Sequence, residues 1–100
     1  MTNIKTIYIA GKMSGKADYG RAEFNEAEKR LTEQGYIVLN PASLPVGLPE
    51  KAYMPICLAM LEAADAIYVL EGWQDSRGAN LEFDYAVYQS KAIVFEADEE

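Results

Sequence analysis

Glu82 has sequence surroundings that suit a nucleophile. It follows the segment Asp75-Ser76-Arg77-Gly78, in which Asp75 or Ser76 can cap a helix and Gly78 lets a ligand approach backbone N–H groups. Glu82 is therefore expected in the first turns of that helix, where the positive end of the helix dipole favours an ionised carboxylate. An ionised, partly enclosed carboxylate in this position suits attack on a sugar carbon. The alternative is that Glu82 is only a good helix residue and that Asp75 and Ser76 are only caps.

A second segment, Gly11-Lys12-Met13-Ser14-Gly15, follows an apolar run, as phosphate-binding loops do. Its spacing matches neither a Walker loop nor a dinucleotide fingerprint, so a simple strand-to-helix turn is the alternative. Four of the nine basic residues lie in or beside this loop and the loop 71–78, namely Lys12, Lys16, Arg21 and Arg77. In a chain of net charge -7, this local positive cluster predicts one small anionic ligand.

Three other side chains are candidates for a site. Asp65 directly precedes an apolar run, and a carboxylate buried there without partners would be costly, which makes it a candidate for a site. The alternative is that Asp65 closes the preceding helix at the exposed bottom edge of the sheet. Tyr8 lies in the first apolar run, where a tyrosine is commonly part of the core with its hydroxyl satisfied. Trp73 could stack on a base or cover the edge of the sheet.

The elements that must position these residues alternate between strand and helix. Apolar runs predict four strands, over residues 4–10, 36–39, 66–70 and 92–95. Helical spacing and capping signals predict three helices, over about 21–34, from near 55 to 63, and over 79–90. The proline-rich residues 41–52 are expected to form an irregular loop, and the acidic tail 96–100 is expected to fray.

This alternation is typical of a parallel sheet with helices on both faces. We predict an α/β, flavodoxin-like (Rossmann-like) three-layer sandwich, with a parallel sheet of four to five strands in the order 2-1-3-4, as a single domain over residues 1–100. In that order the loops 11–15 and 71–78 leave the carboxyl ends of two central strands, at the crevice where such sheets bind ligands. The two loops with unusual chemistry are thus expected to lie together.

Composition narrows the classes of function. The chain has no histidine, which excludes histidine catalysis and histidine-ligated metal, and we expect no cofactor and no metal. Sixteen acidic against nine basic residues disfavour binding to nucleic-acid polymers or to an anionic membrane. The single cysteine, Cys57, cannot form an internal disulfide, and neither a membrane span nor a signal-peptide pattern is visible. We therefore expect a cytoplasmic protein.

Several motifs together resemble the nucleoside 2-deoxyribosyltransferase-like superfamily. They are IYIAGKMSG at 7–15, NPA at 40–42, DAIYVL at 65–70, GW at 72–73 and SRGANLE at 76–82. The match extends over residues 4–95 and is greatest with short phage and bacterial members, related to 2'-deoxynucleoside 5'-monophosphate N-glycosidases. The resemblance implies that Glu82 attacks the anomeric carbon and that Tyr8 orients it. It also implies that Asp65 contacts sugar or base or serves in proton transfer.

The resemblance also implies which residues hold the substrate. Ser76 stands six residues before Glu82, where serine accompanies the phosphate-recognising members and aspartate the nucleoside-using transferases. The expected substrate-binding set is Gly11, Lys12, Met13, Ser14, Gly15, Trp73, Ser76 and Gly78. Lys12-Met13-Ser14 departs from the Ser-Ile-Arg of the hydrolases, so the basic group has moved within the loop, and longer relatives continue beyond the last strand.

We accordingly expect an N-glycosidase that cleaves a (deoxy)nucleoside 5'-monophosphate through a covalent intermediate on Glu82. A nucleoside 2-deoxyribosyltransferase, which exchanges the base, and a non-catalytic nucleotide-binding or regulatory module are the alternatives. A homodimer is expected because the second and third helices carry more large apolar groups than one buried face needs. These groups are Tyr53, Met54, Met60, Tyr85 and Tyr88. The competing explanation for these apolar groups is that the tyrosines lie on the surface of a monomer and keep their hydroxyls in water.

Overall fold

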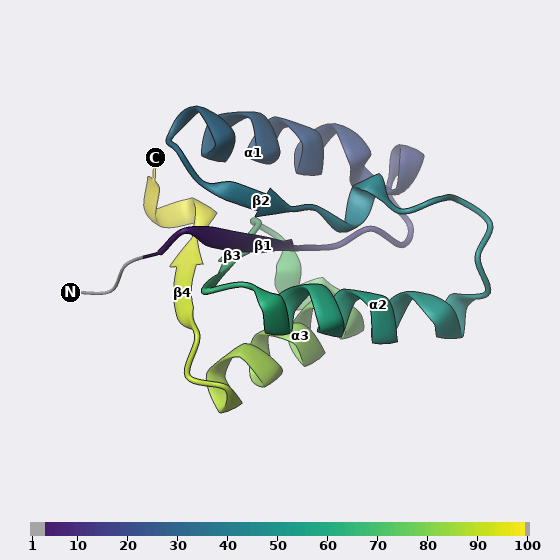
Figure 1. Ribbon diagram of the computed structural model, residues 1–100. Coiled ribbons are helices and arrows are strands. Elements are labelled where there is room, and N and C mark those ends of the chain that lie inside the picture. Colours follow the sequence, from purple (N-terminus) through teal and green to yellow (C-terminus); the bar gives the residue numbers. More distant parts are fainter. Residues whose placement is uncertain (1–3, 100) are drawn as a thin grey trace.

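A four-stranded parallel sheet forms the centre of the protein in a computed structural model that describes residues 4–99 (Figure 1). The strands are β1 (Thr6–Ala10), β2 (Ile37–Leu39), β3 (Ala66–Val69) and β4 (Ala92–Phe95). Their spatial order is β2-β1-β3-β4, and Tyr8 of β1 lies opposite Leu39 and Ile67 in the two central pairings. The predicted order 2-1-3-4 is confirmed.

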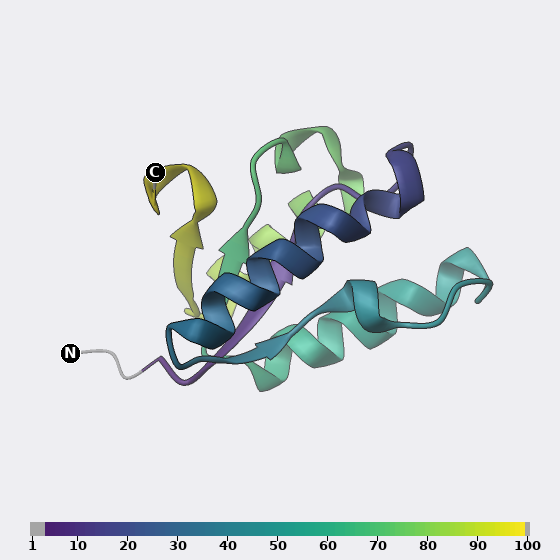
Figure 2. The same cartoon turned by 90° about the horizontal axis from the view of Figure 1, so that it is seen from above.

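Helices cover both faces of this sheet. Helix α1 (Arg21–Glu33) lies on one face, and α2 (Glu50–Ala63) and α3 (Arg77–Tyr88) lie on the other (Figures 1 and 2). Residues 4–99 also contain four short 3-10 segments: η1 (Ala17–Gly20), η2 (Pro41–Ser43), η3 (Trp73–Asp75) and η4 (Glu96–Glu99). The three-layer α/β arrangement is therefore as predicted.

The side chains of β1 alternate between two apolar layers. On the α1 side, Ile7 and Ile9 pack in one cluster with Phe24 and Leu31. On the other side, Tyr8 belongs to a second cluster, whose other buried members are Ala10, Cys57, Leu61, Ala64, Ile67, Val69 and Ala86. Burial on both faces explains why β1 reads as a nearly continuous apolar run. It also places Tyr8, unlike its neighbours Ile7 and Ile9, beside α2 and α3.

The start of α2 differs from the prediction. The helix begins at Glu50, after Pro49 in the N-cap position, and Pro55 lies inside it. The predicted start near Pro55 is wrong. Proline is favoured in the first turn of a helix, and the sequence alone does not show whether Pro49 or Pro55 marks that turn. The irregular segment after β2 is correspondingly shorter than 41–52, since η2 and the first turn of α2 occupy its two ends.

The acidic tail is folded, which corrects the expectation that it frays. Arg30 Nη2 donates a hydrogen bond of 2.9 Å to Glu96 Oε2, and Tyr68 Oη donates one of 2.8 Å to Glu99 Oε1. The acidic side chains that suggested a solvated tail are thus bound within the protein: Glu96 by the Arg30 guanidinium of α1, and Glu99 by the Tyr68 hydroxyl of β3. Residue 100 of the predicted tail, like residues 1–3, lies outside the described part of the chain.

Candidate active site

Tyr8 and Glu82 form a buried pair between the sheet and α3. Tyr8 Oη donates a hydrogen bond of 2.8 Å to Glu82 Oε2, although the two residues are 74 positions apart in the sequence. Tyr8 is 0% exposed and Glu82 is 6% exposed. The second carboxylate oxygen, Oε1, accepts no hydrogen bond from residues 4–99. The pair therefore presents a carboxylate with one oxygen held by Tyr8 and the other without a hydrogen bond from these residues.

Burial governs the ionisation of this pair. It raises the pKa of Glu82 to about 7, although the hydrogen bond from Tyr8 acts in the opposite direction. Burial, followed by the charge of Glu82, also raises the pKa of the Tyr8 hydroxyl well above its usual value. The hydroxyl therefore stays protonated and acts as a donor, and Glu82 changes charge near neutrality.

The expected effect of the helix dipole on Glu82 is not what the structure shows. Ser76 Oγ accepts a hydrogen bond of 3.1 Å from the Ala79 N–H, so α3 begins at Arg77 rather than at Ala79. Glu82 consequently lies in the second turn, beyond the first turn where the dipole acts most strongly. Desolvation dominates there, and the ionised form is disfavoured rather than favoured.

Cys57 of α2 lies beside the pair and was assigned no site role from the sequence. It is 8% exposed and shares an apolar cluster with Tyr8. Burial raises the pKa of its thiol, contact with Tyr8 lowers it, and the charge of Glu82 raises it. The thiol is therefore a neutral group that packs beside the Tyr8–Glu82 pair. Its spacing of four residues before the buried Leu61 is the signal that would have placed it on the inner face of α2.

Asp65 lies at the amino end of the strands, away from the loops 11–15 and 71–78. Its Oδ2 accepts hydrogen bonds of 3.0 Å from the backbone N–H groups of Lys5 and Thr6. These two bonds, the one from Thr6 first, lower the pKa of its exposed carboxyl. The structure does not bring Asp65 to Glu82, so the catalytic role expected for it does not fit. The alternative, closure of the preceding helix at the exposed bottom edge of the sheet, fits in location, but Asp65 bonds the start of β1 and not the end of α2.

The residues before α3 are held mainly by the protein itself. The Trp73 ring stacks on Phe83 with 4.7 Å between centroids and lies 6.4 Å from Phe95, so it covers the edge of the sheet. The hydroxyl of Ser76 is engaged as the helix cap. At Gly78 a Cβ would lie 3.2 Å from the flexible end of Met54. Of these three candidates, Trp73 and Ser76 have the structural roles that were the alternatives to ligand binding.

The loop 11–15 leaves β1 next to the start of the other loop. Leu70 N–H donates a hydrogen bond of 2.9 Å to the Ala10 carbonyl, which brings the ends of β1 and β3 together. A Cβ on Gly11 would lie 2.9 Å from Leu70 Cδ1, so glycine permits this approach. Met13 packs toward the α1 core, while Ser14 and Gly15 are exposed and Lys12 is half-buried.

The basic cluster is partly neutralised. Lys16 forms an ion pair with Glu23 of α1. Within the described part of the chain, Lys12, Arg21 and Arg77 form no ion pair. Arg21 Nε is buried without a hydrogen-bond partner there. Uncompensated positive charge therefore remains around the carboxyl ends of β1 and β3.

Two surface hollows lie elsewhere. One of about 660 Å³ is lined by Arg30, Gln34, Tyr68, Glu71, Glu96 and Glu99. The other, of about 540 Å³, is lined by Leu39, Pro55, Ile56, Ala59, Met60 and Ala63. Across residues 4–99, no group of three or more acidic or cysteine side chains is placed to hold a metal ion. No helix in that range is long and apolar enough to span a membrane.

Comparison with known proteins identifies the family. Residues 5–95 match the model of a domain of unknown function, DUF4406. The chain belongs to the DUF4406 family. No curated protein matches this DUF4406 chain. Among solved structures, it is similar to a 2-desoxiribosyltransferase from Leishmania mexicana, with a TM-score of 0.74 and 24% identity.

That similarity covers 91% of the DUF4406 chain and 63% of the Leishmania chain. This chain therefore corresponds to less than two thirds of that enzyme. At this level of identity the likeness demonstrates a shared fold, and it agrees with the superfamily to which the sequence motifs are similar. It does not by itself transfer an activity.

Replacing Glu82 by glutamine should stabilise the protein above neutral pH. The pKa of Glu82 is raised from 4.5 to about 7 on folding, so stability falls as the pH rises from about 4.5 to 7. Above pH 7 the ionised Glu82 lowers the free energy of unfolding by up to about 3 kcal/mol. Glutamine carries no charge and so avoids this cost, and its amide oxygen can still accept the hydrogen bond from Tyr8. Urea unfolding at pH 5 and pH 8 measures the difference.

The variant should be more stable than the native protein at pH 8, and its advantage should shrink at pH 5. Asp84→Asn is the matched control, because Asp84 is an exposed carboxylate on the same helix. It should change stability little at either pH. An equal effect of Glu82→Gln at both pH values would contradict the raised pKa.

Proposed function

We propose that the protein hydrolyses the N-glycosidic bond of a (deoxy)nucleoside 5'-monophosphate, with Glu82 as the nucleophile. The observation that carries the proposal is the buried Tyr8–Glu82 pair, in which Tyr8 holds one carboxylate oxygen and the other accepts no hydrogen bond from residues 4–99. The fold shared with a 2-desoxiribosyltransferase supports chemistry on a nucleoside. Uncompensated basic residues near the same strand ends support an anionic substrate.

In the proposed reaction, Glu82 Oε1 attacks the anomeric carbon as the bond from that carbon to the base nitrogen breaks. The base leaves with the bonding electron pair and takes a proton from solvent, and the sugar phosphate remains as an ester of Glu82. Water then attacks the same carbon and gives one proton to solvent, which releases the sugar phosphate and regenerates the carboxylate. Tyr8 holds Oε2 throughout, so that Oε1 is the attacking oxygen.

A nucleoside 2-deoxyribosyltransferase is the second candidate, favoured by the shared fold. It would form the same intermediate and pass the sugar to a second base instead of to water. A single assay separates the candidates: incubation with each common nucleoside and deoxynucleoside monophosphate, followed by chromatography. Base release without an acceptor supports hydrolysis, and release only with an added base supports transfer. Thermal stabilisation by nucleotide without any base release supports a non-catalytic binding module.

Glu82→Gln should abolish base release, because an amide keeps the size of the side chain but cannot attack. Tyr8→Phe should lower the rate by about 10- to 100-fold, since a hydrogen bond to a charged group contributes roughly 1.5–3 kcal/mol. Asp65→Asn should leave the rate near the native value, because Asp65 lies at the other end of the strands. Initial rates of base release measure all three variants.

The pH profile provides the control for this mechanism. Attack requires ionised Glu82, whose pKa is about 7, so kcat/KM should rise with pH through that value and then level. A Glu82→Gln protein with the native rate would exclude a covalent step on this residue. Activity that instead falls as the pH rises through 7 would assign Glu82 the role of an acid.

Nucleoside monophosphates should bind at least about 100-fold more tightly than the matching nucleosides, because several charge-assisted hydrogen bonds, each of roughly 1.5–3 kcal/mol, would be lost with the phosphate. Lys12→Gln should narrow this difference, since Lys12 lies in the loop 11–15. Lys29→Gln, at an exposed site on α1, should not. Isothermal titration calorimetry measures both affinities, and equal affinities would shift the assignment to the transferase.

We also propose a homodimer that pairs through α2 and α3. Leu81, Val87 and Tyr88 are exposed on α3, Tyr88 by 83%, and the apolar hollow lies along α2. Tyr53, also expected at the interface, lies in the first turns of α2, where its hydroxyl donates a 2.7 Å hydrogen bond to the Pro45 carbonyl of the preceding segment.

Light scattering coupled to gel filtration should give about twice the chain mass of 11.1 kDa at micromolar concentration. Tyr88→Arg should shift the protein toward monomer, because it places a charge in the proposed interface. Tyr19→Arg is the control, because Tyr19 is exposed outside both helices. A native mass near that of one chain would contradict the dimer.

A further inference from the structure

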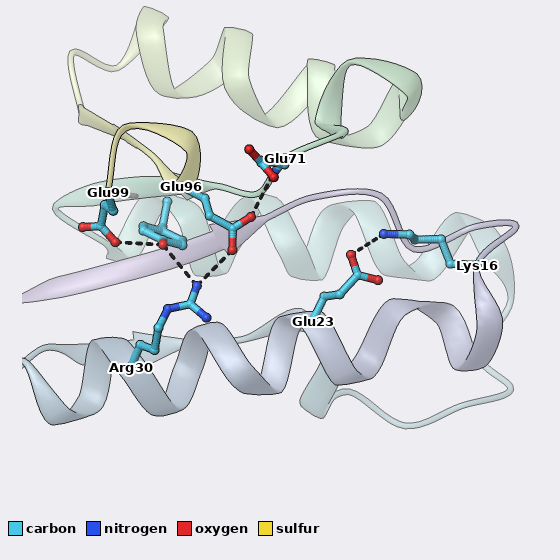
Figure 3. A network of polar contacts seen from close by, with 7 residues as sticks. Lys16, Glu23, Arg30, Glu71, Glu96 and Glu99 are labelled. Carbon is cyan, nitrogen blue, oxygen red and sulfur yellow. Dashed lines mark hydrogen bonds and ion pairs between the residues drawn. The ribbon is translucent and has the colours of Figure 1, made fainter.

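Glu96 connects three parts of the chain through one carboxylate (Figure 3). Its Oε2 accepts a hydrogen bond of 2.9 Å from Arg30 Nη2 on α1. Its Oε1 accepts one of 3.0 Å from the backbone N–H of Glu71. Glu71 begins the loop that runs through η3 to Ser76 and α3. The first residue after β4 therefore ties the start of this loop to the helix on the α1 face.

Phe95 contacts the same loop from the other face of the sheet. Successive residues of a strand point to opposite faces, and Phe95 packs on the α2–α3 side. Its ring lies 6.4 Å from Trp73 and 6.0 Å from Phe83, while Trp73 stacks directly on Phe83. The loop 71–76 is thus held by its backbone at Glu71 on one face and by the Trp73 ring on the other.

Glu99 belongs to the same tail but does not hold the loop. It accepts the 2.8 Å hydrogen bond from Tyr68 Oη, which itself accepts one of 3.3 Å from Arg30 Nη2. In Figure 3 the contacts of Glu96 and Glu99 branch from Arg30, and only the Glu96 branch continues to Glu71. Glu99 therefore offers a control at which a loss of tail contacts can be separated from a loss of loop contacts.

We propose that Glu96 is a positioning residue for the candidate site, because its carboxylate sets the place of the loop 71–76. Ser76 ends this loop and caps α3 by accepting a hydrogen bond from the Ala79 N–H. Under the proposed function, the two backbone N–H groups that precede Ala79 lie at the helix N-terminus, where a ligand phosphate would bind. The Tyr8–Glu82 pair is held separately by β1 and the second turn of α3. Loss of the Glu96 carboxylate therefore weakens substrate binding and leaves the bond-breaking step nearly unchanged. This substrate effect rests on the proposed function, whereas the effect on the loop does not.

The fluorescence of Trp73 reports the loop directly, because it is the only tryptophan in the chain. In Glu96→Ala the emission should shift to longer wavelength, and acrylamide quenching should increase about twofold as the loop opens to solvent. Glu99→Ala should keep the native emission and quenching. Circular dichroism and a thermal melt establish that each variant is folded at the temperature used.

In an active protein, Glu96→Ala should raise KM for the monophosphate about tenfold and keep kcat within about twofold, as expected when an interaction made equally in ground and transition states is lost. Glu96→Gln keeps the size of the side chain and an oxygen for the Glu71 N–H, so it should give the same Trp73 changes at smaller amplitude. It also serves as the test variant if Glu96→Ala does not fold.

A folded Glu96→Ala protein with native Trp73 emission and quenching would overturn the proposal. If Glu96→Ala does not fold, native Trp73 emission and quenching in a folded Glu96→Gln protein would overturn it. Equal changes in Glu99→Ala would also overturn it, because they would reflect general loosening of the tail. If the native protein neither binds nucleotides nor releases base, the proposed function fails, and the Trp73 measurements still decide whether Glu96 positions the loop.

Discussion

Glu82 is buried, at 6% exposed, and among residues 4–99 its side chain accepts one hydrogen bond, from Tyr8. Enclosing a carboxylate in this way opposes its ionisation, which is why its pKa reaches about 7. Burial of this carboxylate therefore costs stability above neutral pH, a cost that an apolar residue at the same position would not have. Tyr8 can serve as its donor because a central strand, buried on both faces, holds the ring in one position.

The two faces of the sheet carry different side-chain contacts. The face under α2 and α3 holds the Tyr8–Glu82 pair, beside Cys57 and apolar side chains. The face under α1 holds the network in which Arg30 contacts Tyr68 and Glu96 (Figure 3). The connection between the faces is the loop 71–76, which starts at the Glu96 contact and ends at the cap of α3. Through this loop, a half-buried ion pair on the α1 face is connected to the geometry around the candidate site on the other face.

The shared fold and the local chemistry support different parts of the functional proposal. A 2-desoxiribosyltransferase from Leishmania mexicana is similar in fold at 24% identity. A fold alone does not specify a reaction, because the same framework can carry different sites. In the proposal, the buried pair supplies the nucleophile, and the basic residues around the carboxyl ends of β1 and β3 favour an anionic substrate. Whether water or a second base completes the reaction depends on what enters after the first base leaves.

The sequence by itself determined the order of the elements and the parallel sheet, because apolar periodicity and short connections leave few possible topologies. It also singled out Glu82 and Tyr8, through their motifs. Tertiary structure alone decided that the two are bonded, that Glu82 is buried enough to resist ionisation, and that Asp65 lies at the far end of the strands. It also decided that the tail folds, since the partners of Glu96 are distant in sequence. Local patterns describe a residue's neighbours along the chain, whereas burial and long-range hydrogen bonds depend on segments that meet only in the folded protein.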